Sequence, residues 1–224
     1  MEVLSPELLA RCAAIASSTW SDALDTLGIE GVVRGITQRA GQGRIVGEAV
    51  TARHVSGKLG DFDKADFAVG RLVAATAPGK VLVVDVGGQA ISTFGGIAST
   101  AAAMRGATAV LIDGACRDVD EIRAAGLWLA SRHVSPVTGK TRLRLQEMGA
   151  PVVLGGVRVQ QGDVVIGDDT GIVVVPRGQI QRVLEAAEEL LEVDERVEKG
   201  VRAGVPFAEA AAKAGYIPNK TSQG

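Results

Sequence analysis

The chain of 224 residues is 46% hydrophobic and 22% charged, and its formal net charge is −2. A chain of this length buries one sizeable core. Its balanced charge and 3% aromatic content lack the basic footprint and stacking residues of nucleic-acid-binding proteins. Its apolar runs are broken by glycine or charge and stay well below the roughly 18 residues that cross a bilayer. We therefore expect a globular protein with neither nucleic acid nor membrane as a partner.

The cysteines and the N-terminus indicate a reducing compartment. Cys12 and Cys116 form no CxxC pair or Cys/His cluster, and Glu2 and Glu7 stand where a leader would be apolar. Disulfides and secretory leaders are features of exported proteins. The sequence therefore predicts a cytoplasmic location.

The first 30 residues predict two helices, because their apolar residues recur at helical spacing. Thr19, or Ser21 with Asp22, is the expected cap of the second helix. Gly28 is its expected end.

Strands and helices then alternate along the chain. Residues 44–56 have the alternation of a strand, residues 62–76 are more helical, and residues 81–86 form an apolar strand. A helix is expected to begin near Gly96, and a further strand covers residues 107–113. This order predicts an α/β fold.

The C-terminal half has a different character. From Leu127, short β runs separated by Gly, Pro and Asp extend to Pro176, as in antiparallel or mixed strands. A long helix from Gln179 to Ala203 follows, and it either covers its own sheet or projects onto a neighbouring subunit. We interpret residues 1–224 as a single domain with a mixed sheet and helical N- and C-terminal extensions.

The first of two notable strand-to-helix junctions offers backbone amides. Gly95, Gly96, Ile97 and Ala98 open a helix, whose first amides lack intrahelical acceptors and whose dipole favours anions. The glycines would let a carboxylate or phosphate approach the backbone closely. A tight turn without a ligand is the alternative, and no nucleotide-binding glycine motif is present.

The second junction offers a cation followed by carboxylates. Asp118 and Glu121 are three residues apart and share a helix face, directly after Arg117. A solvated helix start, in which Arg117 pairs with Glu121, is the alternative. Carboxylate oxygens suit Mg²⁺ or Mn²⁺, and the guanidinium could bind a carboxylate or carbonyl oxygen.

The spacing between the junctions brings them together. The 20 residues between Gly96 and Arg117 have about the length of one helix and one strand, which returns the chain to the same sheet edge. Ligands of α/β proteins bind at that edge. The two junctions together predict a site for an anion and a metal.

The pattern of Gly96, 20 residues, Arg117-Asp118, two residues and Glu121 resembles the signature of the RraA-like family. That family includes regulators of ribonuclease E and class II 4-hydroxy-4-methyl-2-oxoglutarate aldolases, which also decarboxylate oxaloacetate. The resemblance implies a swivelling β/β/α-type fold and a homotrimer or homohexamer with sites between subunits. Segments near both ends of the chain also resemble family segments, namely SDALD (21–25) and GGVRVQQGDVVIGDDTGIVVVP (155–176).

The same resemblance implies roles for individual residues. It implies that Arg117 contacts the keto and carboxylate oxygens of a pyruvyl group and that Asp118 holds Mg²⁺ or Mn²⁺. An acidic residue from a neighbouring subunit's C-terminal region acts through the metal's waters, and Asp194 and Glu195 are the candidates. The backbone amides that hold the pyruvyl group match those of Gly95, Gly96, Ile97 and Ala98.

One position departs from the aldolases, which carry an aspartate where this chain has Gly96. That carboxylate is implicated in protonating the pyruvate enolate. Glu121 could replace it as a proton relay or as a ligand of metal-bound water, so Arg117 and Glu121 are the expected catalytic residues. The chain is also longer than the ribonuclease regulators, which favours an enzyme.

We therefore expect a divalent-metal-dependent lyase that releases pyruvate from 2-keto acids. Decarboxylation of oxaloacetate is expected more readily than retro-aldol cleavage of 4-hydroxy-4-methyl-2-oxoglutarate, because cleavage also needs a base. A non-catalytic regulator of ribonuclease activity, acting by protein binding, is the alternative.

Other polar residues are expected to be structural. His54 and His133 lie in β-like runs, where a structural histidine is commoner than a catalytic one. Asp163, Asp168 and Asp169 lie in a glycine-rich segment and are expected to be turn residues.

Overall fold

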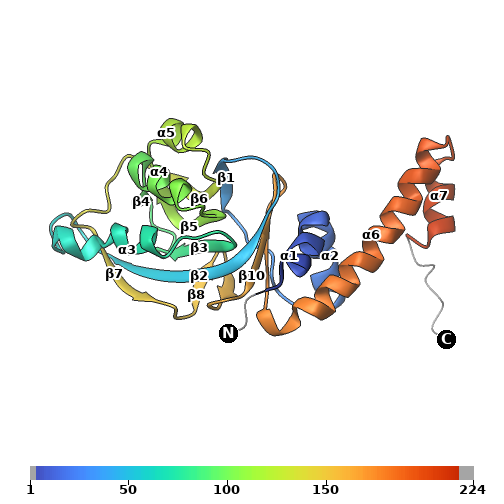
Figure 1. Ribbon diagram of the computed structural model, residues 1–224, viewed down its shortest axis with the longest axis horizontal. Helices are drawn as coiled ribbons and strands as arrows, with labels where there is room; N and C mark the ends of the chain where they lie inside the picture. The colour runs from blue at the N-terminus through green and yellow to red at the C-terminus, as the bar shows by residue number, and fades with distance from the viewer. Residues whose placement is uncertain (1–3, 217–224) are drawn as a thin grey trace.

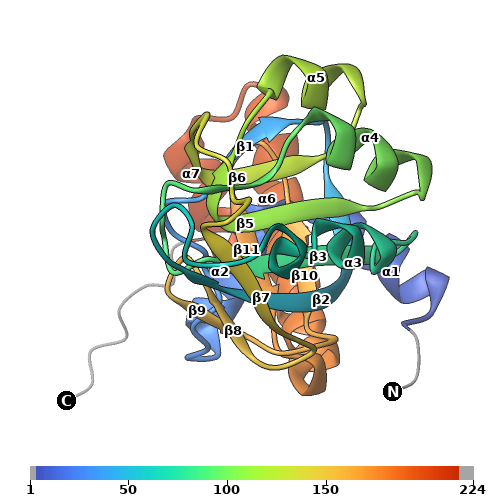
Figure 2. The same cartoon turned by 90° about the vertical axis from the view of Figure 1, so that its left-hand side faces the viewer.

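The computed structural model describes residues 4–216, and its centre is a nine-stranded mixed sheet (Figures 1 and 2). The order of the strands is β1-β6-β5-β3-β2-β10-β11, with β4 paired to β5 and β7 paired to β2. A separate hairpin is formed by β8 (Val152–Leu154) and β9 (Val157–Val159). The strands of the large sheet are β1 (Thr37–Ala40), β2 (Ile45–Ser56), β3 (Lys80–Asp85), β4 (Ser92–Phe94), β5 (Ala109–Cys116), β6 (Leu129–Val134), β7 (Leu143–Met148), β10 (Val164–Gly167) and β11 (Ile172–Val175).

Parallel strands β2, β3, β5 and β6 form the middle of this sheet. Strand β5 is buried along its whole length, as expected for a strand covered on both faces. One face is covered by the helices that connect the parallel strands, and the other by the β8–β9 hairpin. The connecting helices are the 3₁₀ turn η1 (Lys64–Phe67), α3 (Val69–Ala74), α4 (Gly96–Met104) and α5 (Val119–Ala124).

The helices from the two ends of the chain form a second layer against β10 and β11. Trp20 is fully buried there, and its indole N–H donates to the Cys12 carbonyl at 3.3 Å. The helices involved are α1 (Pro6–Ala14), α2 (Ser17–Thr26) and the first half of α6 (Ile180–Arg202).

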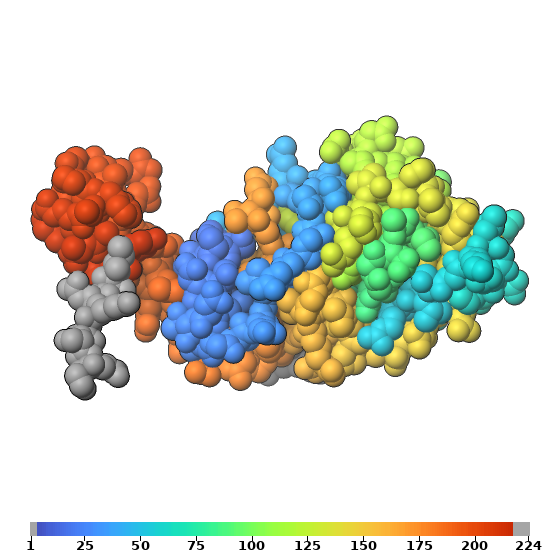
Figure 3. Space-filling model, turned by 180° about the vertical axis from the view of Figure 1, so that it is seen from behind, coloured from blue at the N-terminus to red at the C-terminus, as the bar shows by residue number. Residues whose placement is uncertain are grey.

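The second half of α6 leaves the body of the molecule and pairs with α7 (Phe207–Ala214). We call residues 194–216 the C-terminal arm. It stands at one end of the molecule, and α3 lies near the opposite end (Figures 1 and 3). The predicted long helix is confirmed, and its first half covers the protein's own sheet. Its second half projects away from the sheet, and contact of this half with a neighbouring subunit stays a prediction. No helix within residues 4–216 has the length and hydropathy to cross a membrane.

The expected cap of the second helix was wrong. Helix α2 begins at Ser17, so Thr19 and Ser21 lie inside it. The Ser17 amide donates to the Asp168 carboxylate at 2.8 Å, so the acceptor comes from a distant turn rather than from a local cap. Gly28, with φ of 67°, ends the helix as expected. The mixed α/β fold with a long C-terminal helix is confirmed.

Candidate active site

The two strand-to-helix junctions lie side by side. Strand β4, which the sequence did not predict, follows β3 and pairs in parallel with the end of β5, with Phe94 opposite Cys116. The Arg117 amide donates to the Phe94 carbonyl at 3.0 Å. Gly95 therefore begins its helix directly beside Arg117, which confirms that the junctions share one edge of the sheet.

The first turn of α4 presents amides toward this edge. No acceptor within residues 4–216 pairs with the N–H groups of Ile97 and Ala98, as expected for the first amides of a helix. The Gly96 amide, in contrast, donates to the Asp118 Oδ2 at 3.2 Å. Two of the four expected amides are thus open to an anion, and one is held by the neighbouring junction.

The charged junction is exposed and lies at the start of α5. The Arg117 Nε lies 3.4 Å from the Asp118 Oδ2, and both side chains are 38% exposed. Arg117 therefore pairs with Asp118 rather than with Glu121. Asp118 has φ of 55°, a left-handed conformation that is uncommon outside glycine and that clusters at functional sites.

The two glycines are explained by the acids that face them. A Cβ at Gly95 would lie 2.5 Å from the Asp118 Oδ2. A Cβ at Gly96 would overlap the Glu121 Oε2 and lie 2.6 Å from the Glu121 Cβ. The Glu121 carboxylate therefore fills the space in which a side chain at position 96 would begin.

The junctions line a pocket of about 500 Å³. Its charged side holds Arg117, Asp118 and Glu121, and its other side is largely apolar. Thr93 also lines it, and its hydroxyl is buried without a hydrogen-bond partner. The remaining lining residues come mainly from η1, α3, α4 and the β6–β7 loop, and they include Phe67, Val69, Gly70, Val73, Ala101, Thr138 and Lys140.

The side of the pocket formed by α3 and the β6–β7 loop was not predicted from the sequence. Thr138 and Lys140 come from the loop after β6, and an isolated bridge between Ser92 and Thr138 brings that loop to β4. Val69 and Val73 are one helical turn apart, but α3 has only six residues, so its periodicity is too short to mark a face. Recognising that residues 92–94 can pair with residues 135–142 would have placed this loop beside β4.

The two candidate acids, Asp194 and Glu195, belong to the part of α6 that lies in the arm, at the end of the molecule away from α3 and α4 (Figure 1). Asp194 is half-buried in a groove with Phe207 and Tyr216, and burial together with the charge of Asp22 raises the pKa of Asp194. Glu195 is exposed. One chain therefore does not bring either acid to Arg117.

The residues expected to be structural are so. Asp168 accepts hydrogen bonds from Ser17, Thr170 and Gly171, and Asp163 accepts from the Gln160 amide. The His133 Nε2 lies 3.0 Å from the Gly88 carbonyl oxygen, and the His54 Nε2 lies 3.2 Å from that of Phe67. Burial lowers the pKa of His54. Asp169 is exposed.

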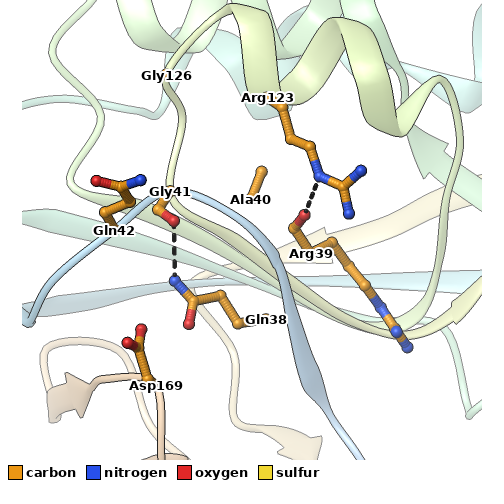
Figure 4. A pocket seen from close by; sticks show the side chains of 8 residues that line it. All are labelled: Gln38, Arg39, Ala40, Gly41, Gln42, Arg123, Gly126 and Asp169. Atoms are coloured by element: carbon orange, nitrogen blue, oxygen red, sulfur yellow. Dashed lines mark hydrogen bonds between the residues drawn. The ribbon is translucent and has the colours of Figure 1, made fainter.

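A second, larger pocket of about 710 Å³ is lined by residues 38–42, Arg123, Gly126 and Asp169 (Figure 4). Arg123 donates to the Arg39 carbonyl at 3.0 Å, and Gln38 donates to the Gly41 carbonyl at 3.2 Å. None of the sequence-predicted site residues lines it. Some of its polar side chains are already hydrogen-bonded to the protein's own backbone. The pocket beside Arg117 therefore remains the candidate site.

The donor chemistry at the site fits a hydrated divalent cation. Within residues 4–216 no three His, Cys, Asp or Glu side chains converge on a common metal position. Mg²⁺ needs only one or two carboxylates when waters and substrate oxygens complete its shell. Asp118 offers an exposed carboxylate of this kind, with Glu121 on the same pocket wall.

Comparison with known proteins places these features in a family. Residues 17–174 match the family model described as RraA-like: Aldolase/RraA. The chain is 28% identical over 188 residues to a Halalkalibacterium halodurans protein named "Putative 4-hydroxy-4-methyl-2-oxoglutarate aldolase", covering 84% of this chain and 85% of that protein. It is also 28% identical over 208 residues to protein DlpA of Legionella pneumophila, covering 92% of this chain but spanning only 33% of DlpA.

Solved structures agree with this match. An uncharacterized protein from Pseudomonas syringae pv. tomato superposes with a TM-score of 0.83 at 26% identity, covering 95% of this chain and 96% of that one. Streptomyces coelicolor RraAS2, described as an unusual member of the RNase ES inhibitor RraA protein family, superposes with a TM-score of 0.76 at 26% identity, covering 87% of this chain and 97% of that one. The family model spans well over half of the chain, and the fold agrees with it. The protein therefore belongs to the RraA-like family.

Proposed function

We propose that the protein is a divalent-metal-dependent carbon–carbon lyase that releases pyruvate from 2-keto acids. Its proposed reactions are decarboxylation of oxaloacetate and, less readily, retro-aldol cleavage of 4-hydroxy-4-methyl-2-oxoglutarate. The observation that carries this proposal is that one pocket holds open helix amides, the Arg117 guanidinium and the Glu121 carboxylate. The aldolase name of the Halalkalibacterium relative supports the same reaction class.

The amides and Arg117 are the proposed binding groups for the keto acid. The substrate carboxylate would accept hydrogen bonds from the Ile97 and Ala98 amides, at the positive end of the α4 dipole. Arg117 would then donate to the keto oxygen, where negative charge develops as the carbon–carbon bond breaks. Asp118 keeps the guanidinium in place, because it pairs with its Nε.

Asp118 is the proposed holder of the metal. A bound Mg²⁺ or Mn²⁺ would supply electrophilic polarisation of the keto oxygen. Because the Asp118 Oδ2 also accepts from the Gly96 amide, the metal-holding residue and the start of α4 are fixed relative to each other.

Glu121 is the proposed proton-transfer residue. In decarboxylation the bond to the leaving carboxylate breaks, its electron pair enters the enolate of pyruvate, and carbon dioxide departs. A proton must then be delivered to the methylene carbon, and the Glu121 carboxyl group lies directly over Gly96 at the start of the amide cradle. In the retro-aldol reaction the same carboxylate would first accept the hydroxyl proton.

We further propose that the functional unit is a homotrimer or homohexamer in which the arm of one subunit completes the site of another. The arm carries the exposed apolar side chains of Val201, Phe207 and Tyr216 at the end of the molecule away from the pocket. Glu195 is the better candidate for a donor to the neighbouring site, because Asp194 is packed within its own arm.

The lyase proposal is tested by measuring pyruvate release from oxaloacetate with the purified protein. Activity should require Mg²⁺ or Mn²⁺ and should be removed by chelation. Absence of metal-dependent pyruvate release from both oxaloacetate and 4-hydroxy-4-methyl-2-oxoglutarate would contradict the proposal.

The shared site is tested by mixing two inactive variants, Arg117→Ala and Glu195→Gln. Random reassembly should restore activity at about a quarter of the sites, because each intact site takes Arg117 from one chain and Glu195 from its neighbour. Asp194→Asn is the matched control, and it should be active by itself. Inactive mixtures that form the same oligomer as the wild-type protein would contradict the shared site.

The alternative is a non-catalytic regulator of ribonuclease activity. The similarity to the structure described as a member of the RNase ES inhibitor RraA family favours it. A regulator with an unused pocket should show no thermal stabilisation by Mg²⁺ with oxalate, whereas the lyase should be stabilised by mass action.

A further inference from the structure

The pocket has two chemically different halves, and a pyruvyl group bound as proposed would occupy only one of them. The charged half begins at Arg117 and the first turn of α4. The opposite half is formed by η1, α3 and one side of α4. Its apolar lining residues are Phe67, Val69, Val73, Ile97 and Ala101.

The side chains of α3 leave the apolar half of the pocket open. Leu72 points into the protein core and is fully buried, whereas Val69 and Val73 are half-buried and line the pocket one turn apart. Between them, Gly70 is exposed and also lines the pocket. A Cβ at Gly70 would meet no atom within 4 Å. Steric crowding does not require glycine at position 70, and the lack of a side chain there leaves free space in the pocket.

The size of the pocket exceeds the needs of oxaloacetate. A volume of about 500 Å³ lies within the range that binds ligands much larger than a four-carbon acid. Lys140 and Thr138, from the loop packed on Phe67, are the polar side chains beside the apolar wall, and Lys140 is exposed. The apolar wall itself offers nothing that would bind a second carboxylate.

We propose that the retro-aldol substrate of this site is a 4-hydroxy-2-keto acid whose leaving half is apolar, an aliphatic or aromatic aldehyde or ketone, and that α3 is the specificity wall for it. This inference rests on the proposed lyase function. In the reaction, the hydroxyl loses its proton, the C3–C4 bond breaks, and the electron pair enters the pyruvate enolate, which then takes up a proton. For 4-hydroxy-2-oxooctanoate the products are pyruvate and pentanal, and no oxidant or reductant is needed.

The test uses three oxamates as probes, because oxamate resembles pyruvate and its nitrogen can carry a substituent toward α3. Binding to the wild-type protein with Mg²⁺ is measured by calorimetry for oxamate, N-butyloxamate and N-oxalylglycine. N-butyloxamate should bind at least about tenfold more tightly than oxamate, since it buries several methylene groups. N-oxalylglycine, which has a substituent of the same size ending in a carboxylate, should show no such gain.

Gly70→Leu tests whether α3 is the wall. The new side chain enters open space in a helix, where leucine is favoured over glycine, so the variant should fold at least as stably as the parent. It should lose the about tenfold gain for N-butyloxamate while binding unsubstituted oxamate as before. Gly178→Leu is the matched control, because Gly178 is also exposed with free space around it and does not line the pocket.

The outcomes separate the two proposals. Oxamate that does not bind would overturn the proposed function and this inference together. If oxamate binds but N-butyloxamate binds no more tightly, or if N-oxalylglycine is preferred through Lys140, the inference is overturned and the lyase proposal stands. A higher kcat/KM for 4-hydroxy-2-oxooctanoate than for 4-hydroxy-4-methyl-2-oxoglutarate, reduced by Gly70→Leu, would support the inference by turnover.

Discussion

The carboxylates inside the sheet and those at the candidate site differ in how many hydrogen bonds they accept from the rest of the protein. Asp113 in β5 is buried and accepts from the Arg132 Nε at 2.5 Å and from the Gly155 amide at 2.8 Å. Asp118 follows on the same chain segment, is 38% exposed, and accepts from Gly96 with one oxygen only. Within residues 4–216, no donor is hydrogen-bonded to Glu121.

This difference indicates which carboxylates have oxygen atoms that can still bind a ligand. The Asp113–Arg132 pair joins β5 and β6 to the β8–β9 hairpin, so its charges are already balanced and its oxygens occupied. Glu48 is similar, because it is buried and accepts from Lys80 and the Leu4 amide. The acids at the start of α5 retain free oxygens beside the candidate site, so they can meet a ligand there.

Removing Arg117 should have the largest effect on function. We expect Arg117→Ala to lower kcat/KM for pyruvate release about thousandfold, because the variant loses the charged donor to the developing oxyanion. Its melting temperature should change little, since the Arg117–Asp118 pair is exposed to solvent. Steady-state kinetics and thermal unfolding check both points. Full activity in this variant would remove Arg117 from the mechanism.

Asp113→Ala should have the opposite profile. We expect a loss of about 3 kcal/mol in the free energy of unfolding, because the variant leaves Arg132 without its buried partner. Urea denaturation measures this loss, and Glu121→Ala is the control, expected to stay within about 0.5 kcal/mol without added metal because Glu121 is exposed on a helix. Equal losses in the two variants would mean that the contrast between the two groups of acids is wrong.

Gly96→Ala sharpens the comparison at the site itself. The added methyl group would overlap the Glu121 carboxylate, so we expect a loss of about 2 kcal/mol in stability. The double variant Gly96→Ala/Glu121→Gly should recover most of it relative to Glu121→Gly alone, because both the Glu121 Cβ and its carboxylate are then removed from the space above position 96. A double-mutant cycle measures this coupling. Additive losses would show that Glu121 does not occupy that space in solution.

His54 should give the smallest effect, seen in the pH dependence of stability. Burial lowers its pKa, only partly opposed by the Phe67 carbonyl, so the unfolded state binds the proton more readily than the folded state. Stability should therefore fall as pH drops below about 6.5, the ordinary pKa of histidine. The lowered pKa values of Glu48 and Asp168 act near and below the ordinary carboxylate range. The raised pKa of Asp194 makes stability fall as pH rises, which is the opposite sign, so a fall in stability from pH 7 to pH 5 reports the histidine.

The control for this scan is His54→Asn, which should lose much of the pH dependence between pH 7 and pH 5. His133→Asn is the matched variant, because it replaces the other histidine and keeps His54. Equal slopes for the wild-type protein and His54→Asn would contradict the assignment.

Much of the candidate site could be predicted from local sequence, because its parts are short and contiguous. The glycines before α4 and the Arg117-Asp118 pair before α5 each mark the start of a helix, and 20 residues suffice to return the chain to the same edge. The missing element was β4, whose three residues carry no periodicity of their own. It exists because its residues pair with the end of β5.

Local sequence patterns are enough to identify the family, the alternation of helices and strands in the first half, and the charged half of the pocket. The packing of distant segments sets the remaining features. It placed the Glu121 carboxylate in the space above Gly96, opened the apolar wall of α3, and separated half-buried Asp194 from exposed Glu195. The physical reason is that helix starts are set by neighbouring residues, whereas the space around a side chain is set by elements that are distant in sequence and close-packed in the fold.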